Sequence, residues 1–261
     1  MIIALLSAGH GLSYHDALKK RPWLRSLALD DPGIAVHVLA AALAGALVLW
    51  LTLPAEELSM LVEEGGPIER PTVWLYLLAA LAAWYLRSPT DDPRTTLAVS
   101  GLLLAFGARE LDLHKAWDGA SMLRVSFFSG DAPLDVKLVM LLVVLLLARW
   151  AGHLLLRHAP RVLRGAAQRD PAATSVVVFL AALVLVSVLD RSASVLAQRF
   201  DVHVGASVGT LLRALEEVAE LVLPLIALLA MCQRKYLRPL DVPSTALTPT
   251  VIAATQRKRP R

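Results

Sequence analysis

Two stretches of this chain place several ionisable side chains directly beside long apolar runs. The first stretch, Arg109 to Lys115, has five ionisable residues in seven and follows the apolar run 102–106. The second stretch, 213–220, carries four charged residues and leads into the apolar run 221–229. Carboxylate, imidazole and guanidinium groups at such close spacing can bind a cation, exchange protons or hold a metal ion.

Helical spacing would group the first stretch into two faces. Glu110 and His114 are four residues apart, so on a helix they would share one face. Arg109 and Asp112 are three apart and would lie on the adjoining face. The pattern therefore predicts one acid and one imidazole that point the same way, with an arginine close by.

The second stretch forms a stripe of its own. Arg213, Glu217 and Glu220 follow one another at intervals of four and three residues, and Glu216 stands four residues before Glu220. Pro224 has no N–H to donate to the carbonyl of Glu220, and its ring favours a kink there. We therefore expect a free carbonyl and a carboxylate at the same residue.

Composition predicts a membrane protein. The 261 residues are 56% hydrophobic, with a mean hydropathy of +0.59, above the roughly 45–50% apolar content of soluble domains. A single cysteine excludes an intrachain disulfide and a Cys-rich metal site. The net charge of +4 comes from basic residues spread over short loops and the tail, which fits contact with membrane lipid better than a nucleic-acid partner.

Apolar periodicity and loop signals predict an all-α, polytopic bundle of about six transmembrane helices. Residues 1–32 read as an amphipathic N-terminal segment on the membrane surface, and 232–261 as a basic tail that we expect to be disordered. The helical domain covers 33–231, with spans at about 33–53, 72–86, 95–114, 136–156, 173–189 and 207–231.

The distribution of lysine and arginine predicts the orientation. With the N-terminus in the cytoplasm, most of the basic residues outside the spans fall on the cytoplasmic side, so both termini are expected inside. Spans three and six then bring their charged stretches to one layer near the outer face. Asp190, which we expect to end span five, reaches the same layer.

Energetics decide what span six can face. Its four charges would cost about 10–14 kcal/mol at the centre of a lipid-exposed helix, whereas its apolar side chains return only about 5 kcal/mol. These residues must therefore face other helices, one another or water. The candidate binding residues are Arg109, Glu110, Asp112, His114, Asp190, Arg213, Glu216, Glu217 and Glu220.

Several functions fit this layer. Transport or handling of a cation or protons is the leading interpretation, because close carboxylates differ in proton affinity. A metal-dependent hydrolase or transferase acting on a lipid-linked substrate is an alternative, and a non-catalytic scaffold held by ion pairs is another. A divalent metal ion would be bound by members of one set: Glu110, His114, Glu216, Glu217 and Glu220.

One resemblance bears on the class of protein. The run 109–115 followed by 216–220 resembles an REhDhHK … EExhE pattern, with h apolar, in uncharacterised multi-pass inner-membrane proteins of bacteria. It implies a multi-pass protein of the bacterial inner membrane and no particular activity. The chain also resembles alkaline ceramidase-like membrane hydrolases in helix number, but the several spaced histidine ligands of that family are missing.

Overall fold

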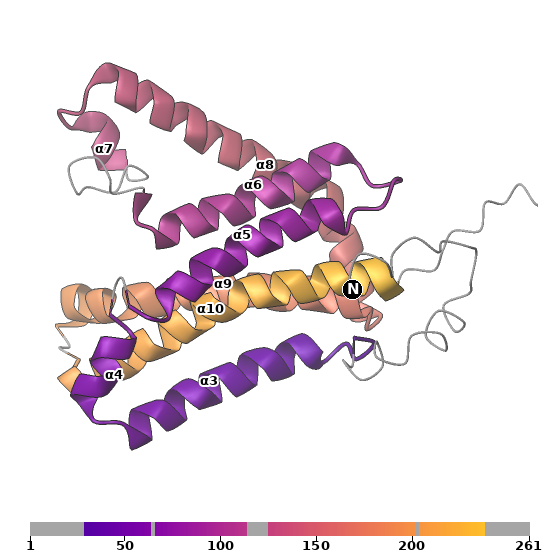
Figure 1. Ribbon diagram of the computed structural model, residues 1–261. Coiled ribbons are helices and arrows are strands. Elements are labelled where there is room, and N and C mark those ends of the chain that lie inside the picture. Colours follow the sequence, from indigo (N-terminus) through magenta and orange to yellow (C-terminus); the bar gives the residue numbers. More distant parts are fainter. Residues whose placement is uncertain (1–28, 64–65, 114–124, 202–203, 238–261) are drawn as a thin grey trace, which may run out of the picture. The chain divides into compact units, whose positions relative to one another are not determined.

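The computed structural model describes residues 29–63, 66–113, 125–201 and 204–237, and all regular structure in these ranges is helical. Most of the expected N-terminal segment 1–32 and of the expected tail 232–261, namely residues 1–28 and 238–261, lies outside the described residues. Figure 1 labels the helices, whose bounds are α3 Ile34–Thr52, α4 Ala55–Leu61, α5 Glu69–Tyr85, α6 Pro93–Glu110, α7 Val125–Ser129, α8 Leu134–Ala167, α9 Pro171–Phe200 and α10 Ala206–Leu237.

Two of the long helices begin with the same local device. Asp92 accepts a hydrogen bond from the backbone N–H of Arg94, and Pro93 occupies the first turn of α6. Asp170 caps α9 in the same way, with Pro171 following it. An aspartate cap satisfies an unpaired backbone donor, and proline at the first position needs none. The dipeptide Asp-Pro therefore fixes where each helix begins.

Helix α10 lies at the centre of the packing. Its Ala219 and Leu223 join one buried apolar cluster with α5, α6 and α9, and its Val222 and Ile226 join a second cluster with α3 and α9. In Figure 1, α10 runs between α3 and the pair formed by α5 and α6. Helix α10, the last helix among the described residues, thus packs against α3, α5, α6 and α9.

Buried hydrogen bonds hold α10 in this position. The Gln233 side chain accepts a hydrogen bond from the Ser175 hydroxyl of α9 at 2.6 Å and donates one to the Leu29 carbonyl at 3.2 Å. Gln233 and Ser175 are both completely buried. Because unpaired polar groups are costly inside a protein, these bonds fix the register of α10 against α9.

Helix α8 differs from α10 in its burial, because none of its residues is buried. It packs beside α6 (Figure 1). Gly101 of α6 allows the approach, because a side chain there would overlap the ring of Trp150. Most of α8 therefore keeps an apolar surface free of protein neighbours among the described residues.

Three of these helices, α3, α8 and α9, are long and apolar enough to cross a membrane. Helix α5 has 17 residues, and α10 carries its charges within the apolar stretch. The helical fold that the sequence predicts is thus confirmed, together with a set of membrane-crossing candidates.

Several helices continue past the boundaries of the predicted spans. Helix α9 continues through Asp190 and Arg191 to Phe200, and α8 continues through the basic segment 157–167. A membrane boundary sets where charges appear, but a helix ends only where its backbone pattern is broken, and no glycine or proline follows Asp190 within α9. Pro224 lies inside α10, and the segment between the first two expected spans contains α4.

Candidate functional site

A pair of acidic side chains on α6 and α10 shares one arginine. The Arg109 guanidinium donates to the Glu220 carboxylate at 2.9 Å and lies 3.5 Å from the Glu110 carboxylate. The two carboxylate side chains are only 9% and 6% exposed, whereas that of Arg109 is 39% exposed. The carboxyl groups of Glu110 and Glu220 also interact with each other. Two buried acids thus face a single positive charge.

Further charged side chains surround this pair, and we call Arg109, Glu110, Glu216, Glu217 and Glu220 the carboxylate cluster. Glu216 and Glu217 are partly buried and interact electrostatically with Glu220. Asp190 of α9 is exposed and interacts with Arg109 and Glu216, and the exposed Arg213 interacts with both neighbouring glutamates. The structure therefore brings most of the predicted site residues into one electrostatic neighbourhood.

The packing of α10 matches the energetic requirement on its charges. Glu220 is buried among helices, and its neighbour Ala219 belongs to the central apolar cluster. Arg213, which lies about two helical turns before Glu220, is exposed. The buried carboxylate of Glu220 has a charged partner in Arg109, as a buried charge requires.

Tyr76 of α5 is a member of this neighbourhood that the sequence reasoning missed. It is 1% exposed and interacts electrostatically with Glu110 and Glu220. Trp74, two residues before it on α5, is 69% exposed. The signal was present in the helical spacing of Tyr76 to Ala79 and Ala80, which form the buried face of α5.

The predicted helical face that joins Glu110 to His114 is wrong, because α6 ends at Glu110. Asp112 adopts a left-handed conformation with φ of 51°, and it lies partly exposed in the turn. Aspartate tolerates this conformation better than most residues do. The intervals of three and four residues in 109–114 therefore do not place side chains on one helical face.

The predicted metal set is only partly described. His114 lies outside the described residues. Within the described part of the chain, no three histidine, cysteine, aspartate or glutamate side chains are arranged so that they could hold a metal ion. The other four members of the predicted set interact with arginine and with one another: Glu110, Glu216, Glu217 and Glu220.

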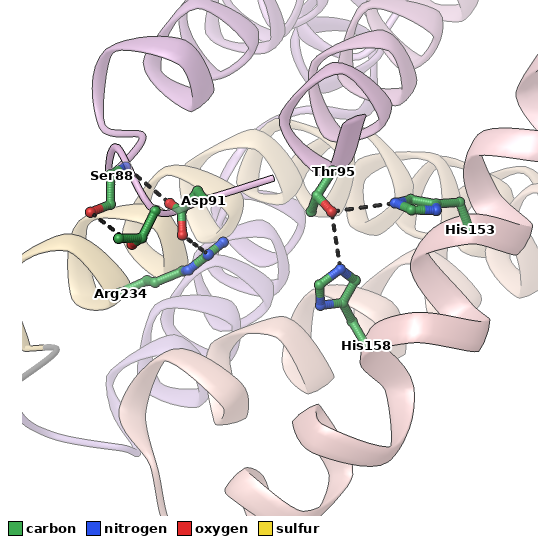
Figure 2. Close-up of polar contacts among 7 residues, drawn as sticks. Ser88, Asp91, Thr95, His153, His158 and Arg234 are labelled. Atoms are coloured by element: carbon green, nitrogen blue, oxygen red, sulfur yellow. Dashed lines mark hydrogen bonds and ion pairs between the residues drawn. The ribbon is translucent and has the colours of Figure 1, made fainter. Parts of the chain in front are cut away.

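A second polar site lies where the α5–α6 loop meets α8 and α10 (Figure 2). Arg234 of α10 donates to Asp91 at 2.6 Å, and Asp91 also accepts from the backbone N–H of Ser88 at 3.0 Å. Arg157 of α8 donates to Asp92 at 2.7 Å. Two neighbouring aspartates thus attach one short loop to two different helices.

Next to this loop, the Thr95 hydroxyl lies between two imidazoles of α8. It is 3.3 Å from His153 Nε2 and 3.2 Å from His158 Nε2. A hydroxyl has one proton to donate, so when both rings are neutral one accepts this proton and the other donates its own. Burial, followed by the positive charges of Arg234 and Arg157, lowers the pKa of His158. The sequence pattern did not identify Thr95 as the shared partner of these histidines.

In the part of the chain that the structure describes, fold and site together define a helical protein with three helices long and apolar enough to cross a membrane and a carboxylate cluster between α6 and α10. Comparison with protein-family models, with curated proteins and with solved structures gave no match.

Proposed function

We propose that this protein is a six-helix protein of the bacterial inner membrane, with both termini cytoplasmic, and that its carboxylate cluster takes up and releases protons or a small cation. The observation that carries the proposal is the pair of buried carboxylates, Glu110 and Glu220, which share the single guanidinium of Arg109. One positive charge cannot neutralise two negative ones, so a further proton or cation is needed for neutrality.

The charge surplus extends beyond this pair. Glu216, Glu217 and Asp190 add negative charge, and the exposed Arg213 interacts with Glu216 and Glu217. An ion-pair network that only stabilised helix packing would be expected to contain equal numbers of positive and negative charges, because an uncompensated buried charge is costly. The excess acid supports a site that binds something positive.

Six spans are supported by length. Helices α5 and α6 contain 17 and 18 residues, which correspond to about 25–27 Å and approach the roughly 30 Å of a bilayer core. A reporter fused after Gly130 is expected to lie outside the cytoplasm, and one fused after Arg261 inside it. Fusions that report the same compartment at both positions would overturn this topology.

Ion flux tests the cluster directly. Purified protein in liposomes that contain a pH-sensitive dye should accelerate proton entry down an imposed gradient, with sodium and potassium gradients as parallel probes. Glu110→Gln and Glu220→Gln each remove a titratable group and keep the side-chain shape, so we expect each to lower the flux at least tenfold. Glu57→Gln, at an exposed position on α4, is the matched control and should retain it.

A structural lock is the second candidate, and the 2.9 Å contact of Arg109 with Glu220 between α6 and α10 favours it. It would be supported by wild-type protein that carries no proton or cation flux, while Glu220→Gln lowers the melting temperature. Flux that depends on Glu110 and Glu220, with the Glu57 control unchanged, would exclude it.

A further inference from the structure

Arg149 is a charged residue inside the apolar part of α8. It is the one aspartate, glutamate, lysine or arginine between Leu138 and Leu156. Its side chain is exposed, and no hydrogen bond or ion pair joins it to the residues that the structure describes. An unpaired arginine on a lipid-facing helix is costly unless an anion accompanies it.

The surroundings of Arg149 form an open groove along one side of α8. Its lining consists of Arg149, Gly152, His153, Leu156 and Arg157, and we call it the α8 groove. The two arginines and the histidine follow at four-residue intervals, so they lie on one face with about 6 Å between successive positions. The groove is therefore basic along its length.

Charge and apolar surface occur together in this groove. Arg157 remains 51% exposed although it donates to Asp92, so the ion pair leaves much of its guanidinium accessible. Leu156 is 87% exposed, and the neighbouring face of α8 continues into further exposed leucines, including Leu142 and Leu145. A dissolved anion would use the arginines but would leave this apolar wall exposed.

From this combination we infer that the α8 groove binds an anionic phospholipid, with the phosphate between Arg149, His153 and Arg157 and an acyl chain along Leu156. The arginines supply charge-assisted hydrogen bonds to phosphate oxygens, which they bind in a forked geometry. The space above Gly152 is open, because a Cβ atom at this position would meet no protein atom within 4 Å, so a large side chain there would occupy the groove. The site is separate from the carboxylate cluster and does not depend on its function.

Lipid retention tests the inference. Purified full-length protein in detergent is incubated with equal amounts of dioleoylphosphatidylglycerol and dioleoylphosphatidylcholine, and the bound lipid is counted by native mass spectrometry. Wild-type protein should retain phosphatidylglycerol preferentially. Arg149→Gln should reduce this preference about fivefold, the effect expected for one basic residue near a membrane surface.

Gly152→Leu provides a second variant that fills the groove and keeps every charge. It should lower retention of phosphatidylglycerol by a similar factor. Its matched control is Gly45→Leu on α3, where a side chain also meets no protein atom within 4 Å, and Arg199→Gln on α9 controls for loss of an exposed positive charge. Both controls should bind lipid as the wild type does.

Three results would overturn the inference. Equal retention of the two lipids by the wild-type protein would remove any preference for an anionic headgroup. Equal losses in Arg149→Gln and Arg199→Gln, or in Gly152→Leu and Gly45→Leu, would show diffuse attraction in place of a site. Displacement of phosphatidylglycerol by inorganic phosphate at the same concentration would identify a free phosphate as the ligand.

Discussion

Helices α8 and α10 have nearly the same length, and each contains an internal proline, yet their surroundings are opposite. Helix α10 has nine buried residues, which include a glutamate, whereas α8 has none. The three acidic residues of α10, Glu216, Glu217 and Glu220, are partly or fully buried, whereas the charged residues of α8 are mostly basic and exposed. The chain thus uses one helix as its core and another as its outer surface.

The difference shows that hydropathy alone does not locate a helix in this bundle. Helix α8 passes the criteria for a membrane-crossing helix, and α10 does not. Among the charges that disqualify α10 in isolation, Glu220 pairs with Arg109, and α10 packs among α3, α5, α6 and α9. A charged helix can therefore be the most protected element, provided that its partners carry matching groups.

The largest effect should come from removing the partner of the core charge. Arg109→Met leaves Glu220 buried without its ion pair and should lower the free energy of unfolding by about 3 kcal/mol, measured by denaturant titration in mixed micelles. Arg149→Met removes an unpaired arginine of α8 and should change it by no more than about 0.5 kcal/mol. The double variant Arg109→Met/Glu220→Met should recover much of the loss. Equal losses of unfolding free energy in Arg109→Met and Arg149→Met would contradict the contrast between α10 and α8.

A smaller effect is expected where α8 touches the rest of the bundle. Gly101→Ala places a methyl group against the Trp150 ring, and this overpacking should cost about 1–3 kcal/mol of stability. Gly152→Ala meets no protein atom within 4 Å, so the better helix propensity of alanine should leave stability unchanged or raise it by up to about 1 kcal/mol. Thermal melting of both variants in the same detergent measures the difference, and a stable Gly101→Ala protein would contradict the packing described here.

The smallest effect concerns pH at the basic end of α8, beyond the expected span 136–156. The pKa of His158 is lowered in the folded protein, so protonation favours the unfolded chain. Stability should be unaffected above the unfolded value of about 6.5 and should decline as the pH falls below it. His158→Gln should reduce this decline when melting is compared at about pH 7.5 and about pH 5.5, and an unchanged decline would speak against a neutral, partly buried imidazole in the folded protein. Carboxylates elsewhere titrate in both proteins and cancel in the comparison.

The helical class and the need to shelter the charges of α10 were predictable from the sequence. Runs such as 136–156 are too apolar and too long for anything but a helix in lipid. The cost of four unpaired charges excludes exposure of span six to hydrocarbon. Both arguments depend on composition and length, which do not change with tertiary contacts.

The local geometry of the site was less predictable. The end of α6 at Glu110 depends on the left-handed conformation of Asp112, which the pattern of charges does not encode. The burial of Tyr76 and the contact of Thr95 with two histidines depend on which helices become neighbours. Sequence periodicity predicts the helix face on which a residue lies, but it does not identify which other helix packs against that face.

The central position of α10 has a consequence for the order of synthesis. Arg109 precedes its partner Glu220 by 111 residues, so at about 5–20 residues per second the arginine waits roughly 5–20 s before α10 emerges. During this interval α3, α5 and α6 lack the helix against which they pack. The bundle therefore closes around α10, and a ribosome that stops before residue 206 leaves a protein without this central helix.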